Sequence, residues 1–303
     1  MNKRENKEIV LGFLGGFFTF AAGFGVLARS AYERSHLVTS IHYIEGKKVP
    51  RAFDGYRIAV VADLHNNRFG EKNADLIQAI QTAKPDLVLI AGDAMVVKTG
   101  RKMDYSALEE LLKGLNDKYP IYYVKGNHEE RMKRRKDLYP GWYEAFVKLL
   151  ARYHCIYLEN ASAVITRGTE SLRLTGFDLP ETYYRVRFRK GRLPENLISS
   201  CVGPQDDACY DILVAHSPLY AEDYSKWGAD LAISGHFHGG TIRIPGLGGL
   251  MSPQYQFFVG LDRGMYKVND MVQVTSGGLG THSIDLRLNN MSELVVISLK
   301  NHT

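Results

Sequence analysis

Apolar runs and helical patterns alternate along the first half of the sequence, beyond a distinct N-terminal stretch. Residues 56–62 and 86–91 are short, continuous apolar runs rich in β-branched side chains, which predicts two buried strands. Residues 121–125 predict a third strand, and residues 73–83 and 105–115 have the apolar spacing typical of helices. This βαβαβ order predicts a sheet with right-handed crossovers and helices on its faces.

Shorter apolar segments dominate the second half. Residues 163–165 and 172–175 predict a pair of antiparallel strands. Further short strands are predicted at residues 212–215, 231–234, 241–244, 272–275 and 294–299. Together with the first half, these elements predict an α/β fold, namely a four-layer α/β/β/α sandwich in which two mixed sheets pack face to face between outer helices.

The N-terminal stretch has a different pattern. Residues 9–28 read IVLGFLGGFFTFAAGFGVLA and contain no charge. A helix of that length rises about 30 Å, the thickness of a bilayer's hydrocarbon core, which predicts one transmembrane helix. The expected organisation is an N-terminal tail at 1–8, the transmembrane anchor at 9–28, a linker and entry segment at 29–49 and one large domain at 50–303. A signal peptide cleaved near Ala28 and a buried helix of a water-soluble protein are the two alternatives.

Charges on either side of this span bear on its orientation. Lys3, Arg4 and Lys7 precede the span, whereas Arg29 and Arg34 follow it. The excess of positive charge on the N-terminal side favours an N-terminus in the cytoplasm and a body outside it. We therefore expect a single-pass protein of the cell membrane whose large domain is extracytoplasmic.

Composition narrows the class of protein further. The chain is 45% hydrophobic and 23% charged, which is typical of a globular domain. A formal net charge of +5 permits an anionic partner, but no nucleic-acid-binding signature accompanies it. Cys155, Cys201 and Cys209 form no CxxC pair, which argues against a zinc ribbon. A disulfide between Cys201 and Cys209 and a pair of free thiols are both compatible with the spacing, and the oligomeric state has no sequence signature.

Polar residues of metal-ligand type follow the predicted strands at their carboxyl ends. They form, in chain order, the motifs DxH, GD, GNHE, an isolated His and GHxH. In open α/β sheets ligands bind in the crevice outside the carboxyl ends of the strands, so we expect these side chains to converge. The expected metal ligands are Asp63, His65, Asp93, Asn127, His216, His236 and His238.

This set of side chains predicts a centre for two metal ions. Two carboxylates, four imidazoles and one amide suit borderline divalent ions such as Mn²⁺, Fe²⁺ or Zn²⁺, and they are too many for one tetrahedral ion. Two such ions about 3.5–4 Å apart would clamp a phosphate and lower the pKa of a bridging water. Attack by the resulting metal-bridging hydroxide would cleave a phosphoester, since phosphoryl transfer needs mainly positioning and charge stabilisation.

The ordered motifs resemble the signature of the calcineurin-like metallophosphoesterase superfamily, and the match extends over roughly residues 50–300. The apolar N-terminus and the context SGHFHGG make the chain similar to bacterial membrane-associated members, which include phosphodiesterases and UDP-2,3-diacylglucosamine pyrophosphatases. The resemblance implies a metallophosphoesterase fold. It also implies a first metal held by Asp63, His65 and His238, a second held by Asn127, His216 and His236, and a bridging Asp93.

The same resemblance implies two catalytic residues. His128 would contact the phosphate and protonate the leaving group, and Glu129 would orient His128. The chain departs from many relatives at Val96, where they carry an acidic or amide residue, and this departure affects fine substrate contacts. It also carries Phe237 between the GHxH histidines, where several relatives have Thr or Ser, which indicates either a hydrophobic portion of the substrate or simple packing.

From these features we expect a membrane-anchored, dinuclear metal-dependent phosphoesterase that hydrolyses a phosphodiester or a pyrophosphate, with lipid-linked and UDP-sugar-lipid substrates in view. A phosphomonoesterase of the cell envelope and a catalytically silent metal-binding scaffold at the membrane are the alternatives. Basic residues at 183–192 admit two interpretations, either a clamp for an anionic substrate or lipid headgroup, or a solvated loop.

Overall fold

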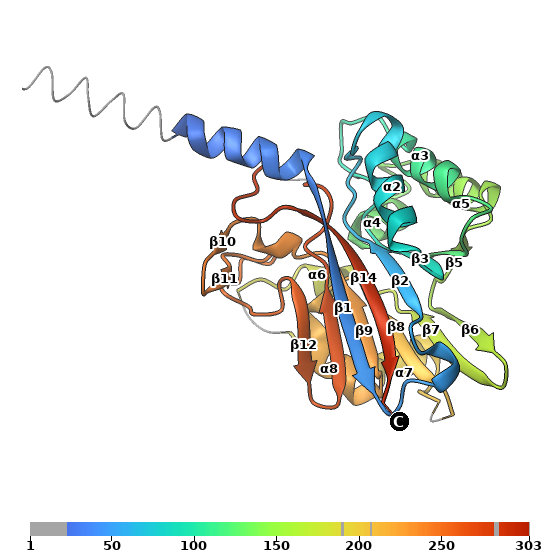
Figure 1. Ribbon diagram of the computed structural model, residues 1–303. Coiled ribbons are helices and arrows are strands. Elements are labelled where there is room, and N and C mark those ends of the chain that lie inside the picture. The colour runs from blue at the N-terminus through green and yellow to red at the C-terminus, as the bar shows by residue number, and fades with distance from the viewer. Residues whose placement is uncertain (1–22, 189–190, 207, 282–284, 303) are drawn as a thin grey trace, which may run out of the picture.

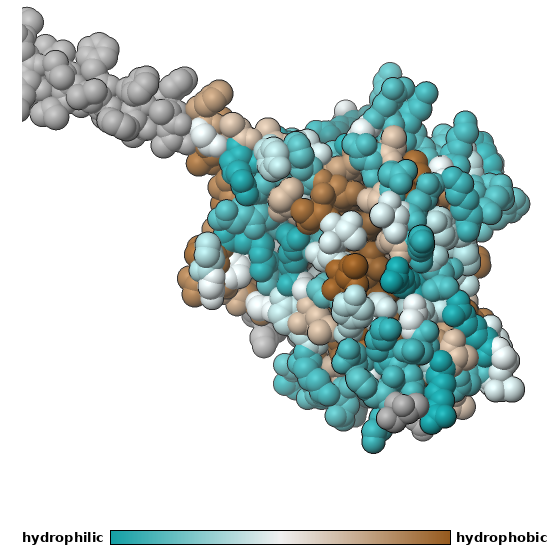
Figure 2. Space-filling model, in the orientation of Figure 1, coloured by the Kyte–Doolittle hydropathy of each residue, from teal (hydrophilic) through white to brown (hydrophobic). Residues whose placement is uncertain are grey.

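The computed structural model of the protein describes residues 23–188, 191–206, 208–281 and 285–302. The N-terminal helix projects from the body of the protein (Figure 1). Most of the predicted transmembrane segment therefore lies outside the described residues. Within the described ranges, no helix is both long enough and apolar enough to span a bilayer. Residues 23–35 are helical, and Phe24 and Leu27 near the start of this helix are 67% and 66% exposed. Figure 2 shows apolar side chains gathered there, and further apolar patches near the middle of the same face.

The first of two six-stranded sheets has the order β1–β14–β2–β3–β4–β5. Its strands span Leu37–Gly46 (β1), Arg57–Val61 (β2), Leu87–Ala91 (β3), Ile121–Val124 (β4), Ile156–Tyr157 (β5) and Ser292–Asn301 (β14). Strands β2 to β5 run parallel, as the βαβαβ pattern predicts. Because β14 is antiparallel to β2 and parallel to β1, the sheet is mixed.

The second sheet has the order β12–β13–β9–β8–β7–β6. Its strands span Ala161–Arg167 (β6), Glu170–Gly176 (β7), Tyr210–Val214 (β8), Leu231–Ser234 (β9), Gly264–Val268 (β12) and Met271–Thr275 (β13). The inner strands are parallel, whereas the two outermost strands are antiparallel to their neighbours, so this sheet is also mixed. The antiparallel pairing predicted for the two segments that became β6 and β7 is confirmed.

Hydrophobic side chains fill the spaces between four layers. On β2, Ile58 and Val60 pack into the core between the two sheets, while Ala59 and Val61 face the outer helices. Burial on both faces is the reason for the continuous apolar run at this strand. Helices α2 (Ala74–Ala83), α3 (Ser106–Leu115) and α5 (Trp142–Arg152) cover the first sheet (Figure 1), and α7 (Leu197–Val202) and α8 (Ala221–Trp227) cover the second.

The structure departs from the sequence expectations at two elements. Strand β1 lies within residues 29–49, which we assigned to a linker, yet it pairs along its whole length with β14. It was missed because it is an edge strand with a half-exposed pattern that leaves Ile41 and Tyr43 in solvent. The strand predicted at residues 241–244 is reduced to β10 (Arg243–Ile244), which pairs with β11 (Gly248–Gly249) outside both large sheets.

Two open questions from the sequence concern the second half of the chain. Cys201 and Cys209 are both free thiols, so the disulfide alternative is not formed in this structure. In the basic segment, Arg185 forms an ion pair with Glu181 at 2.6 Å, and the Arg187 guanidinium lies 5.2 Å from the ring centre of Tyr255. These two arginines are engaged within the protein, which favours a surface role for them over a substrate clamp.

Candidate metal centre

The five motif loops converge at the carboxyl ends of strands from both sheets. Asp63 and His65 follow β2, Asp93 follows β3, and Asn127 begins helix α4 (Asn127–Arg134) directly after β4. From the second sheet, one histidine follows β8 and two follow β9, so that the complete set is Asp63, His65, Asp93, Asn127, His216, His236 and His238. All of them are at most 9% exposed. The topology therefore brings the predicted residues into one buried place.

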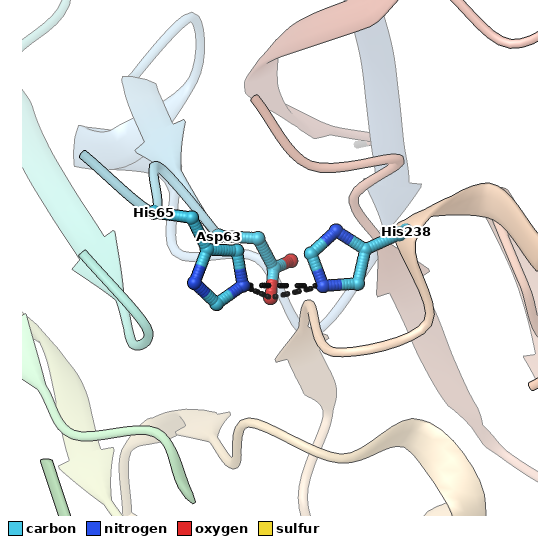
Figure 3. A group of neighbouring side chains, drawn as sticks. All are labelled: Asp63, His65 and His238. Carbon is cyan, nitrogen blue, oxygen red and sulfur yellow. Dashed lines mark hydrogen bonds and ion pairs between the residues drawn. The ribbon is translucent and has the colours of Figure 1, made fainter. Parts of the chain in front are cut away.

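Asp63, His65 and His238 form the first group of side chains (Figure 3), with ligand atoms that all lie within 4.8 Å of one another. The Nε2 atoms of His65 and His238 are 3.2 Å apart, and His238 Nε2 lies 3.6 Å from Asp63 Oδ1. Two imidazole nitrogens at this separation require a proton or a cation between them, because their lone pairs would otherwise repel. One oxygen and two nitrogen atoms around a common point suit a borderline divalent ion.

Asp93, His216 and His236 form a second group with the same compactness. His216 Nε2 lies 3.2 Å from Asp93 Oδ2, and His65 of the first group lies 3.8 Å from the same oxygen. Asp93 therefore stands between the two groups. Next to them, Asn127 Oδ1 is buried and accepts no hydrogen bond from any residue that the structure describes, which is costly for an acceptor unless a ligand completes it. The donor set thus fits a second divalent ion.

Hydrogen bonds on the outer side of the rings orient the histidines. His216 Nδ1 donates to Ala91 O at 2.7 Å and His238 Nδ1 donates to Gly280 O at 3.0 Å, which leaves the Nε2 lone pairs facing the cluster. His236 Nε2 lies 2.8 Å from the amide of Gln254. A flip of that amide would turn its buried, unpartnered oxygen to His236 Nε2 and free Nδ1 as a ligand.

The pKa values of the two carboxyl groups in the cluster are shifted in opposite directions. Burial raises the pKa of Asp63 to about 7, although His216 and a backbone N–H from His236 favour its ionised form. Burial also disfavours ionised Asp93, but His216 and His128 outweigh it, so that its pKa lies well below the usual value. For His216, burial lowers the pKa, but Asp93 raises it to about 10. The pocket therefore favours positive charge, which a divalent ion would supply.

The backbone of the motif loops is strained at the ligands themselves. The left-handed region is occupied by Asp63 (φ 52°), His65 (φ 49°), Asp93 (φ 53°), His236 (φ 68°) and His238 (φ 49°). Each such residue costs about 1 kcal/mol or more, and it persists only where the surroundings fix it. Here Asp63 N donates to Gly92 O and His65 N donates to Asp93 O, so that the first two loops hold each other. The fold thus sets the ligand directions before any ion binds.

His128 is oriented by the backbone and not by Glu129, which corrects the role implied by the family resemblance. Its Nδ1 accepts the N–H of Val97 at 2.8 Å, so the neutral ring carries its proton on Nε2. His128 also forms a group with His65 and Asp93. A ring with its proton on Nε2 and its Nδ1 already occupied is a hydrogen-bond donor and not a metal ligand, which favours a role as proton donor.

Glu129 instead joins two motif loops. Its carboxylate accepts hydrogen bonds from the backbone N–H groups of Asp93, Ala94 and Gly126 at 2.8–3.0 Å and from the hydroxyl of Tyr123 at 2.8 Å. The side chain is completely buried. Glu129 is therefore a positioning residue, because it fixes the GD loop against the GN loop.

Glutamine at position 129 is expected to destabilise the protein by about 3 kcal/mol, since its NH₂ group would face N–H donors that the carboxylate now satisfies. Urea unfolding of Glu129→Gln checks this value. The matched control is Glu144→Gln, which removes an exposed ion pair to Lys136 and should leave the free energy of unfolding nearly unchanged. Equal effects of the two substitutions would contradict the role given to Glu129.

A loop near the C-terminus supports the site, and the motif analysis did not identify it. The guanidinium of Arg287, fully buried, donates to Gly277 O, Gly278 O and Gly280 O, and Gly280 O also accepts from His238. Asn290 Nδ2 donates to the carbonyl of His238 at 2.6 Å. Only the glycines around Gly280 signalled this loop in the sequence. Burial lowers the pKa of Arg287 to about 10, which leaves it charged at neutral pH.

Phe237, the second departure from the family pattern, is 1% exposed and packs with the core that underlies α8. It also lines a cavity of about 150 Å³ beside His238. The packing interpretation of Phe237 therefore holds for most of its ring.

Comparisons with known proteins agree with this geometry. The sequence profile of the calcineurin-like phosphoesterase family matches residues 56–240. The chain is 25% identical to the uncharacterized metallophosphoesterase YkuE of Bacillus subtilis over 99% of both chains. It is 26% identical to the phosphodiesterase YaeI of Escherichia coli over 80% of this chain and 82% of that protein. The phosphopantetheinyl hydrolase of Mycobacterium tuberculosis aligns in structure with a TM-score of 0.43 and 12% identity, over 75% of this chain and 91% of that one.

Proposed function

The chain belongs to the calcineurin-like phosphoesterase family and is a metal-dependent phosphoric ester hydrolase, and from that premise we propose that its site holds two divalent ions and cleaves a phosphodiester or a pyrophosphate. The observation that carries the proposal is the pair of compact groups, Asp63–His65–His238 and Asp93–His216–His236, that meet at Asp93. Asn127 supplies the second group with an acceptor that has no hydrogen-bond partner among the described residues.

Each residue of the site has a distinct task. The two groups and Asn127 would hold the ions, which would supply Lewis acidity and neutralise charge on the phosphate. The protein holds the proton that the leaving group needs on Nε2 of His128. Glu129, Arg287 and Asn290 keep the loops in place, so that ligand directions do not change during turnover.

The name of the relative YaeI, a phosphodiesterase, supports a diester over a monoester substrate. A cavity of about 540 Å³ that is lined by His65 offers room for the second arm of such a substrate. We also propose that residues 9–28 attach the protein to the membrane, that its large domain is extracytoplasmic and that its substrate is lipid-linked. These parts of the proposal are supported by the sequence alone.

The test is a metal-reconstitution assay on the full chain in detergent. Protein stripped by a chelator should cleave neither bis(p-nitrophenyl) phosphate nor p-nitrophenyl phosphate, and Mn²⁺ should restore mainly diester cleavage. Metal analysis should find about two ions per chain. Cleavage of the monoester alone would replace the proposal by a phosphomonoesterase, and bound metal without cleavage of any phosphoester, including pyrophosphates, would indicate a silent scaffold.

A further inference from the structure

A basic basin lies beside the metal centre, on the side of His65. We use this name for the cavity of about 540 Å³ whose walls include the cationic side chains of Arg34, Arg101 and Lys102. A cavity of this size takes a small-molecule ligand. His65 is part of its wall, so a phosphoester bound at the metal centre would extend directly into it.

The carboxylates of the basin have hydrogen-bond partners within the protein, whereas its cationic side chains have no ion-pair partner in the described ranges. Of its two carboxylates, Asp104 accepts a hydrogen bond from the Ser106 N–H at 2.9 Å, and Asp285 accepts one from the Thr281 hydroxyl at 2.7 Å. The cationic side chains form no ion pair with any residue in the described ranges. Arg34 is the half-buried one of the three, and its Nε is shielded from solvent without a hydrogen-bond partner in the described part of the chain. An unsatisfied, buried guanidinium nitrogen indicates that an anionic group belongs next to it.

Arg34 is also held firmly in this position. It lies near the end of the helix of residues 23–35, where Glu33 accepts the backbone N–H groups of Asn289 and Asn290 at 3.0 and 2.8 Å. Ser30 accepts the N–H of Arg287 at 3.0 Å. The carbonyl of Arg34 itself accepts from Asn67 Nδ2, a residue of the basin wall, at 3.2 Å. The helix is therefore part of the catalytic domain at this end, although it lies outside the family match at residues 56–240.

We propose that the N-terminal helix completes the substrate site, with Arg34, assisted by Arg101 and Lys102, binding a second phosphate group that the substrate carries beyond its scissile phosphoester. The proposal rests on the function proposed above and makes it more specific, because it selects a phosphorylated nucleotide or a diphosphate over a simple diester. Arg34 would act in binding, since its planar guanidinium matches two phosphate oxygens.

Two thymidine compounds test the subsite without turnover. Thymidine 3′,5′-bisphosphate and thymidine 5′-monophosphate differ only in the second phosphate, and their affinities for the full-length protein with Mn²⁺ can be measured by calorimetry. The wild type should bind the bisphosphate about tenfold more tightly, and Arg34→Gln should abolish that difference. The matched control, Arg152→Gln on the outer helix α5, should keep it. Equal affinities in the wild type, or an unchanged ratio in Arg34→Gln, would overturn the proposal.

Kinetics on the corresponding p-nitrophenyl esters separate this proposal from the function itself. The 5′-p-nitrophenyl ester of thymidine monophosphate is compared with the same ester bearing a 3′-phosphate, and the ratio of their KM values should fall to about one in Arg34→Gln, with the ratio of kcat values unchanged. Turnover of both esters with no KM preference would leave the hydrolase in place and remove the subsite. No turnover of either ester, with the calorimetric preference for the bisphosphate intact, would contradict the hydrolase function and leave the phosphate subsite in place.

Discussion

Replacing Asp93 by asparagine is expected to lower kcat/KM on a phosphodiester by about a thousandfold, because stabilisation by the two proposed ions would amount to several kcal/mol and would depend on this carboxylate. Asp93 Oδ2 lies 3.2 Å from His216 Nε2 and 3.8 Å from His65 Nε2, one in each group. A neutral amide there would weaken both metal sites together. Steady-state kinetics, with metal analysis of the purified variant, would measure the effect.

The matched control for this substitution lies at the opposite end of the same strand. Asp86, which precedes β3, accepts the backbone N–H of Arg57 at 2.7 Å, away from the cluster. Asp86→Asn should change the stability modestly and leave kcat and the metal content intact. If Asp93→Asn kept two ions and near-normal turnover, the shared position of Asp93 would have no catalytic meaning, and the role of Asp93 as a bridging ligand would have to be abandoned.

A second large effect is expected for His128→Gln, and its size should depend on the leaving group. Because His128 holds a proton on Nε2, its loss should slow the release of a poorly leaving alkoxide by about a thousandfold. A p-nitrophenolate leaves without protonation, so its release should slow by only about tenfold. The measurement is kcat for two diesters of the same nucleotide, one with a p-nitrophenyl and one with an alkyl leaving group.

Metal analysis completes the test of His128. The histidine belongs to a third compact group with His65 and Asp93, so a ligand role is the competing interpretation. Loss of an ion from His128→Gln would establish that role, and an equal fall in kcat for both esters would show that His128 only positions the phosphate. His154→Gln, at an exposed histidine far along the chain from the motifs, is the control that should change neither quantity.

The clustering of the candidate metal ligands was predictable because their signal is local. Each of these residues follows a strand that is buried on both faces. Such a strand has a continuous apolar sequence, as in β2 and β3. The convergence of Asp63 and Asp93 then follows from the rule for carboxyl ends of parallel strands, because β2 and β3 are parallel neighbours. Residue type and position along the strand were sufficient, and no knowledge of side-chain contacts was needed.

The supporting contacts were not predictable, because each depends on residues far apart in the sequence. Strand β1 forms its ladder with β14, more than two hundred residues later, and its own pattern is only half buried. The family resemblance implied that Glu129 orients His128, whereas its carboxylate accepts hydrogen bonds from the loop after β3. The attachment of Glu33 to residues 289–290 joins the two ends of the chain and leaves no local pattern.

The same joining of the chain ends limits where the protein can be shortened for purification. A cut at residue 50 would remove β1 and expose the apolar ladder edge of β14, which invites aggregation through edge-to-edge strand pairing. It would also remove Ser30 and Glu33 and leave the backbone N–H groups of residues 287, 289 and 290, of which 287 and 290 are buried, without these acceptors. A cut after Ala28 keeps all of these contacts and discards the exposed apolar start of the helix, so residue 29 is the latest safe first residue for a well-behaved preparation.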